Sequence, residues 1–279
     1  MHNPVRVASL TVLAMLAFAG NSLLCRVALR DTAIDAASFT SIRLASGALV
    51  LAAIMYGRKS HPLAAGTWRA AAMLFAYAAF FSFAYRQLSA ATGALLLFGA
   101  VQTTMLGYGL ATGERLRALQ LIGLLVALAG LAGLLLPGLA APPIEGAVLM
   151  LGAGVAWGIY SLLGRGGQDP SGATAGNFLR TLPFAAILSL ATAAHASIDD
   201  AGVMYAVLSG AIASGLGYVL WYAALPALKA ASAATIQLSV PVLAALGGVV
   251  LLAEPITQRL LISSAAILGG IALVILRRR

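Results

Sequence analysis

Ten apolar stretches, each about 20 residues long, follow one another along this chain. An α-helix needs about that length to cross the hydrocarbon of a bilayer, and the chain is 61% hydrophobic and only 9% charged. We place the spans at 7–26, 36–57, 66–85, 90–112, 118–137, 146–165, 174–195, 201–225, 229–252 and 257–276. The loops between them are short. The sequence therefore predicts an all-α integral membrane protein with ten transmembrane helices and no soluble domain.

The chain also repeats itself at a distance close to half its length. SLLCR at 22–26 returns as SLLGR at 161–165, and residues 93–130 align with residues 233–270 at a constant offset of 140. We therefore expect two five-helix repeats, residues 1–140 and residues 141–279. An odd number of spans turns the second repeat upside down, and inverted repeats let a cavity open alternately to either side of a membrane. The simpler alternative is duplication for packing alone, as a plain helix bundle.

The basic residues are divided unevenly between the two sides of the predicted membrane protein. If the N-terminus is cytoplasmic, the inner loops and tails hold 11 lysines and arginines, and the outer loops hold four. The positive-inside rule then predicts cytoplasmic N- and C-termini in a multi-pass protein of the cell inner membrane. The net charge of +9 does not indicate a nucleic-acid partner, because no aromatic or glycine-rich surface accompanies the basic residues.

A few polar and aromatic side chains fall inside the spans, where a polar group needs a partner, a cavity or water. Three are amides on spans one, four and nine, and four are aromatic residues on spans six and eight. The predicted substrate-binding residues are Asn21, Gln102, Trp157, Tyr160, Tyr218, Trp221 and Gln237. A cleft of aromatic rings and amides suits a small organic molecule. The structural alternatives are hydrogen bonds between helices and anchoring at the membrane interface.

Three further residues are candidates for gating or bending. Arg43 and Arg180 lie about seven residues into spans two and seven, at near-equivalent repeat positions. Each side chain is long enough to reach the headgroups, and each could instead hold a substrate carboxylate or gate one mouth of a cavity. Pro241 is expected to kink span nine, because a proline inside a helix removes one backbone hydrogen bond.

Several chemistries have no support in the sequence. All eight acidic residues and all three histidines fall in loops or at helix ends, which leaves no obvious proton relay inside the spans. The chain has no G-x-S-x-G, H-E-x-x-H or Walker A motif, and its single cysteine, Cys25, cannot form an internal disulfide. We therefore expect no enzyme activity, no cofactor, no metal and no tight coupling to protons.

One long motif resembles a known family. SVPVLAALGGVVLLAEPIT, residues 239–257, resembles the end of an EamA repeat of the drug/metabolite transporter superfamily, and GAVQTTMLGYGLATGERL, residues 99–116, is a looser version. The resemblance implies a ten-helix, two-repeat carrier in which helices three, four, eight and nine move around a central cavity. The YddG-like aromatic amino acid exporters are one branch that the chain resembles, although FGAVQTTML at 98–106 lacks the proline-containing pattern of that branch.

Together these features predict an inner-membrane secondary transporter that exports small organic metabolites by alternating access. The resemblance implies amino acids, including aromatic ones, as substrates, and a monomer that meets only its substrate and membrane lipids. Nucleosides, sugars and drug-like compounds are the alternative substrates. Two other classes stay open: a membrane-embedded enzyme acting on lipid-linked substrates, and a channel.

Overall fold

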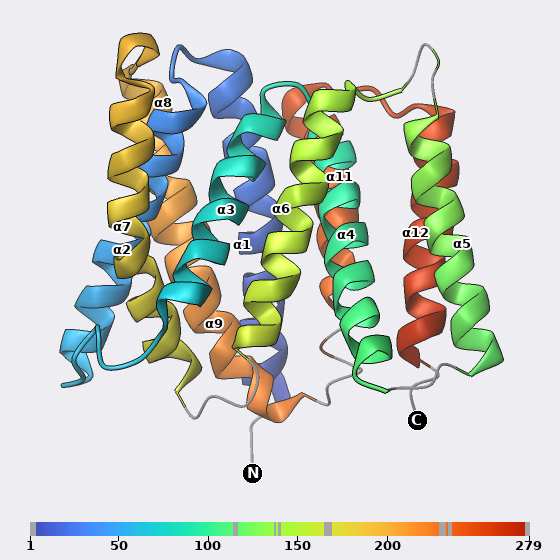
Figure 1. Ribbon diagram of the computed structural model, residues 1–279, viewed down its shortest axis with the longest axis horizontal. Helices are drawn as coiled ribbons and strands as arrows, with labels where there is room; N and C mark the ends of the chain where they lie inside the picture. Colours follow the sequence, from blue (N-terminus) through green and yellow to red (C-terminus); the bar gives the residue numbers. More distant parts are fainter. Residues whose placement is uncertain are drawn as a thin grey trace.

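The computed structural model describes residues 4–113, 117–136, 138, 141–164, 169–228, 233 and 236–276, and the described part is helical without strands (Figure 1). The α-helices are α1 (Pro4–Asp31), α2 (Ala36–Gly57), α3 (Trp68–Tyr85), α4 (Ala90–Ala111), α5 (Ala118–Leu135), α6 (Ile144–Leu163), α7 (Pro170–Ala191), α8 (Asp200–Val207), α9 (Gly217–Ala224), α11 (Ser239–Leu252) and α12 (Gln258–Leu276). Short 3-10 turns lie at η1 (Ala193–His195) and η3 (Leu225–Ala227), and η2 (Leu208–Leu216) is a π-helix.

These elements follow the predicted spans closely. Seven helical segments of the described chain are long and apolar enough to cross a membrane, and one of them, Asp200–Ala227, joins α8, η2, α9 and η3. Helices α3, α7 and the shorter α11 occupy the remaining predicted spans. The starts are fixed locally, because Asp35, Thr67 and Ser89 each accept a hydrogen bond from a backbone N–H in the first turn of α2, α3 and α4. The predicted all-α membrane fold is confirmed.

The helices stand side by side as an upright bundle, with the start of α1 and the end of α12 at the same end (Figure 1). We call this the terminal end, and the opposite one, with the loops at 32–35, 86–89 and 253–257, the distal end. Helices α5 and α12 pack together at one side of the bundle, and α2 packs against α7 at the other. Close approach of α5 and α12 depends on small residues, since a Cβ built on Gly130 would lie 2.7 Å from that of Ala266.

The contacts between helices come in matching pairs. Helix α3 packs on α6 as α9 packs on α1, and α4 packs on α6 as α11 packs on α1. Such pairs are what two five-helix repeats would produce, because α1 would correspond to α6 and α4 to α11. The division into residues 1–140 and 141–279 stays a prediction.

The irregular points of the bundle differ from the one predicted. Pro241 was expected inside span nine, but a turn at Leu238 interrupts the helix and α11 begins at Ser239. Pro241 therefore lies in the first turn of α11, where a missing N–H costs no helical hydrogen bond. Residues 229–232 and 234–235 of the predicted span lie outside the described residues. Two irregularities were not predicted: Pro183 inside α7 and the π-helix η2.

A candidate substrate cavity

A cavity of about 680 Å³ lies between α1, α3, α4, α6, α7 and α9 and extends to the end of α12. Its lining includes all seven residues that the sequence predicted for substrate contact: Asn21, Gln102, Trp157, Tyr160, Tyr218, Trp221 and Gln237. They come from both halves of the chain and from five separate helical segments. The structure thus brings the seven together, and their binding of a substrate stays a prediction.

Aromatic rings form one continuous wall of this cavity. The centroids of Trp157 and Tyr218 are 5.5 Å apart with an interplanar angle of 23°, so these two rings are stacked. Tyr77 continues the row on one side of Trp157, at 4.5 Å, and Tyr222 continues it beyond Tyr218, at 6.2 Å. A row of this kind offers flat apolar faces to a flat apolar ligand.

The three predicted amides of the lining fall into two groups. Asn21 is held on both sides, because its amide donates to the Tyr77 hydroxyl at 3.3 Å and its carbonyl accepts from Ser209 at 2.7 Å. Gln102 and Gln237, by contrast, also line the cavity, and neither side chain forms a hydrogen bond with another described residue. These two amides are therefore available to a ligand.

The predicted set omits several lining residues with polar tips, Asn177, Thr174 and Tyr77 among them. Asn177 donates to the Tyr160 hydroxyl at 3.5 Å, and Thr174 lies one turn earlier on the same helix. Tyr77 belongs to a row spaced by four residues with Phe81 and Tyr85 on α3, and that spacing was a usable signal for a shared face. An amide within an apolar span was the corresponding signal for Asn177.

The cavity reaches one end of the bundle and stops short of the other. Its lining includes Gly164, Pro170 and Ile275, which lie at the terminal ends of α6, α7 and α12. Asn21, Ser22 and Tyr77 line it on the distal side, and no described residue of the loops at the distal end lines it. The structure therefore has a one-sided cavity directed toward the terminal end.

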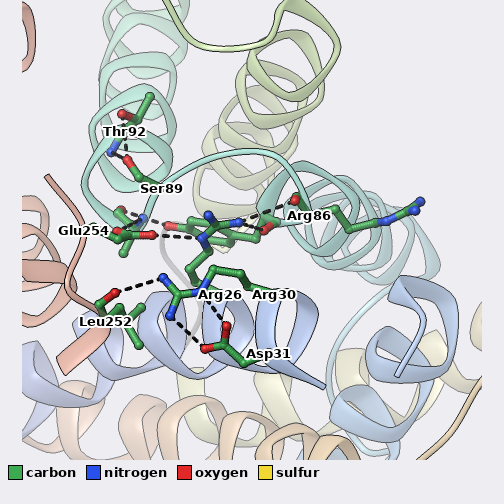
Figure 2. Close-up of polar contacts among 10 residues, drawn as sticks. Arg26, Arg30, Asp31, Arg86, Ser89, Thr92, Leu252 and Glu254 are labelled. Carbon is green, nitrogen blue, oxygen red and sulfur yellow. Dashed lines mark hydrogen bonds and ion pairs between the residues drawn. The ribbon is translucent and has the colours of Figure 1, made fainter. Parts of the chain in front are cut away.

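Charged hydrogen bonds hold the distal end together (Figure 2). The Arg26 guanidinium donates to the Glu254 carboxylate at 2.9 Å, and the second carboxylate oxygen accepts from the N–H of Ala90 at 2.8 Å. Arg26 also donates to the carbonyl of Tyr85 at 3.0 Å, and Arg30 donates to that of Leu252 at 3.0 Å. We call these residues, Arg26, Arg30, Tyr85, Ala90, Leu252 and Glu254, the distal cluster. It joins α1, α3, α4 and α11 above the closed end of the cavity.

Glu254 corrects the expectation that every acidic residue is peripheral. Its side chain is only 7% exposed, and it reaches the interior because Ala253 adopts a left-handed backbone with φ of 51°. The carboxylate lies at the N-terminus of α4, where the helix dipole favours a negative charge. Sequence reasoning placed Glu254 at a helix end but could not show that this end is buried.

The two candidate gating arginines have different surroundings. Arg180 is tied to backbone carbonyls near the terminal end, at 2.8 Å from Ala65 and 3.0 Å from Gly176. Arg43 is only 3% exposed, so its side chain does not extend to the headgroups. Neither arginine nor Pro241 lines the cavity. Within the described chain, no group of three or more His, Cys, Asp or Glu residues could hold a metal ion.

Comparisons with known proteins agree with this architecture. The model of the EamA-like transporter family matches residues 144–276. The chain is 62% identical over 274 residues to the uncharacterized protein PA1977 of Pseudomonas aeruginosa, covering 98% of this chain and 96% of that one. It is 38% identical over 72 residues, 26% of each chain, to an uncharacterized transporter of Archaeoglobus fulgidus. One solved crystal structure, at 23% identity, superposes with a TM-score of 0.67 over 97% of this chain and 99% of its own.

Proposed function

This chain belongs to the EamA-like transporter family of the drug/metabolite transporter superfamily, and from that premise we propose that it exports small organic metabolites, amino acids among them, across the cell inner membrane. We propose further that it works by alternating access, with both termini in the cytoplasm. The uneven distribution of lysine and arginine supports this orientation.

The observation that carries the proposal is the make-up of the cavity. Its volume of about 680 Å³ falls in the range of small-molecule sites, and its lining combines stacked aromatic rings with two amides that have no partner among the described residues. An aromatic amino acid would place its ring against Trp157 and Tyr218 and its polar end near the amides. A bare ion would gain little from such a wall, which disfavours an ion channel.

Alternating access would require the two ends of the bundle to open in turn. In the present conformation the distal cluster joins four helices, and the cavity reaches the terminal end. With cytoplasmic termini this is an inward-directed state, and the distal cluster would have to separate before a substrate could leave on the outer side. Glu254 is already paired with Arg26, so we expect export without strict dependence on a proton gradient.

Transport by purified protein in liposomes tests the proposal. Radiolabelled L-phenylalanine, L-tryptophan, L-leucine, glucose and uridine are compared, with and without a pH gradient. We expect saturable uptake and counterflow of the aromatic amino acids in both conditions. Uptake of only the sugar or the nucleoside would show that the substrates are not amino acids. Strict dependence on the pH gradient would contradict export without proton coupling. Non-saturable flux would indicate a channel.

Matched tryptophan variants connect transport to the cavity. Trp157→Ala removes the centre of the aromatic wall, whereas Trp68→Ala removes a tryptophan that is 57% exposed on the same bundle. We expect the first to lower the apparent affinity for aromatic amino acids about tenfold and the second to leave it unchanged. Equal apparent affinities in the two variants would mean that the substrate does not bind against Trp157 in this cavity.

A further inference from the structure

Arg43 is a buried cation without a counter-ion among the described residues. Its side chain is 3% exposed, and no described carboxylate forms an ion pair with it. One of its guanidinium nitrogens, Nη1, is buried and has no hydrogen-bond partner among the described residues. Arg26, in the distal cluster, is by contrast paired with Glu254. A buried charge that lacks its partner is costly, and such a charge inside a membrane protein commonly marks a functional site.

The guanidinium lies directly behind the wall of the cavity. Its central carbon is 5.3 Å from the ring centroid of Tyr77 and 4.9 Å from that of Phe81, and both rings line the cavity. Its Nη2 donates to the Tyr77 hydroxyl at 3.1 Å. Only the rings of Tyr77 and Phe81 therefore separate the positive charge from the cavity. The hydrogen bond to the Tyr77 hydroxyl connects the guanidinium to the cavity.

The Tyr77 hydroxyl has one donor position to spare. A phenol oxygen accepts two hydrogen bonds and donates one. Here it accepts from Arg43 at 3.1 Å and from Asn21 at 3.3 Å, and no described residue accepts its proton. Asn21 is in turn fixed by Ser209. The deep end of the cavity thus presents an O–H donor that a guanidinium polarises, which is an arrangement suited to an anion.

The described lining offers nothing comparable to a cation. Among the described residues that line the cavity there is no aspartate, glutamate, lysine or arginine. Among these described residues a substrate ammonium group would meet only neutral amides, hydroxyls and ring faces. The electrostatic preference of the site is set from behind its wall, by Arg43.

We propose that the deep end of this cavity is a carboxylate subsite, formed by the Tyr77 hydroxyl, which the Asn21 amide holds in place, and charged by Arg43, so that the preferred substrates are carboxylates with a flat apolar body. This inference rests on the proposed function and narrows it: the carboxylate is required and the amino group is not. Aromatic acids that lack an ammonium group should then bind as well as aromatic amino acids.

Equilibrium binding separates this inference from the question of transport. Trp157 and Trp221 both line the cavity, so in a Trp68→Phe background the remaining tryptophans report on ligand by fluorescence. The probes are 3-phenylpropionate, its uncharged analogue 3-phenylpropanamide, and the amine 2-phenylethylamine, with L-phenylalanine as reference. We expect the carboxylate to bind about ten- to a hundredfold more tightly than the amide, and the amine to bind most weakly.

The variant R43Q should abolish that preference, with carboxylate and amide binding equally. The matched control R180Q should keep it, because Arg180 is bonded to backbone carbonyls outside the cavity. If R43Q does not fold, Y77F retains the ring, removes the donor, and should lose the preference as well. The inference is overturned if wild-type protein binds the carboxylate and the amide equally, or if it binds none of the probes. It is also overturned if either R43Q or Y77F keeps the full preference for the carboxylate. Absence of amino acid transport with carboxylate-selective binding intact would contradict the proposed function alone.

Discussion

The distal and terminal ends of the bundle are built from the same kinds of helix, yet among the residues that the structure describes a buried ion pair joins helices only at the distal end. There, Arg26 on α1 and Glu254 after α11 connect helices that are far apart in sequence. At the terminal end, α6 and α7 border the cavity instead, and Arg180 is bonded to backbone carbonyls. The difference suggests which contacts a transport cycle must break. Four predictions test it, ordered from the largest expected effect to the smallest.

The largest effect is expected from Glu254→Gln. This change removes the charge that pairs with Arg26 and weakens the acceptor for the N–H of Ala90. Loss of one partner of a buried pair costs about 3 kcal/mol or more, so we expect a clear drop in the melting temperature of the purified protein. Glu145→Gln is the matched control, because Glu145 lies at the same end, is exposed, and bonds only Gln87 among the described residues. Equal melting temperatures would mean that the distal cluster contributes nothing.

The internal repeat offers a second test, at the other end. In the repeat, Arg26 corresponds to Arg165 and Glu254 corresponds to Glu114. Arg165 and Glu114 lie outside the described part of the chain. If the repeats exchange conformations, Arg165 and Glu114 should matter in the state that closes the terminal end. We expect R165Q and E114Q to slow exchange about tenfold, with less effect on melting than E254Q. Wild-type exchange rates would contradict the symmetric mechanism.

Side-specific labelling measures the closure directly. In a Cys25→Ala background, Ser22→Cys places a thiol in the cavity lining below the distal cluster. An impermeant maleimide should label it from the terminal side. Adding E254Q should raise labelling from the distal side about tenfold, because it makes the state that is closed at the distal end less stable relative to the state that is open there. Ser82→Cys, at a buried position outside the cavity, is the control and should stay unlabelled. Labelling of Ser22→Cys from the distal side alone would reverse the assigned polarity.

The smallest effect concerns Asp35, a carboxylate at the distal end that caps α2. Burial alone would raise its pKa, but hydrogen bonds from Ser38, Ser197 and Ala37 outweigh burial and hold the pKa below its usual value. A lowered pKa in the folded state means that the carboxylate stabilises the fold at neutral pH and loses this contribution as the pH falls through that pKa. Asp35→Asn turns the oxygen that accepts from the N–H of Ser197 into an amide donor, so it should cost about 1 kcal/mol at pH 7 and less in acid. A pH-independent difference in melting temperature would contradict this account.

Much of the site was predictable because polar and aromatic residues stand out in apolar spans. Asn21, Gln102 and Gln237 were chosen as amides on the repeat-related spans one, four and nine, and all three line the cavity. Glu254 and Arg43 show the limit of such reasoning. A glutamate at a helix end looks solvated until neighbouring helices are seen to bury it, and an arginine seven residues into a span looks able to reach the surface. Burial depends on neighbours that sequence spacing does not specify.

The sequence by itself determined the membrane class, the ten spans and the set of residues that would need a cavity, because hydrophobic length and the cost of polar groups in lipid act locally along the chain. Only the tertiary structure decided which end is closed, which arginine is paired, and that the Tyr77 hydroxyl connects Arg43 to the cavity. Those outcomes depend on distances of about 3 Å between helices that are far apart in sequence, since hydrogen bonds and ion pairs have only that reach.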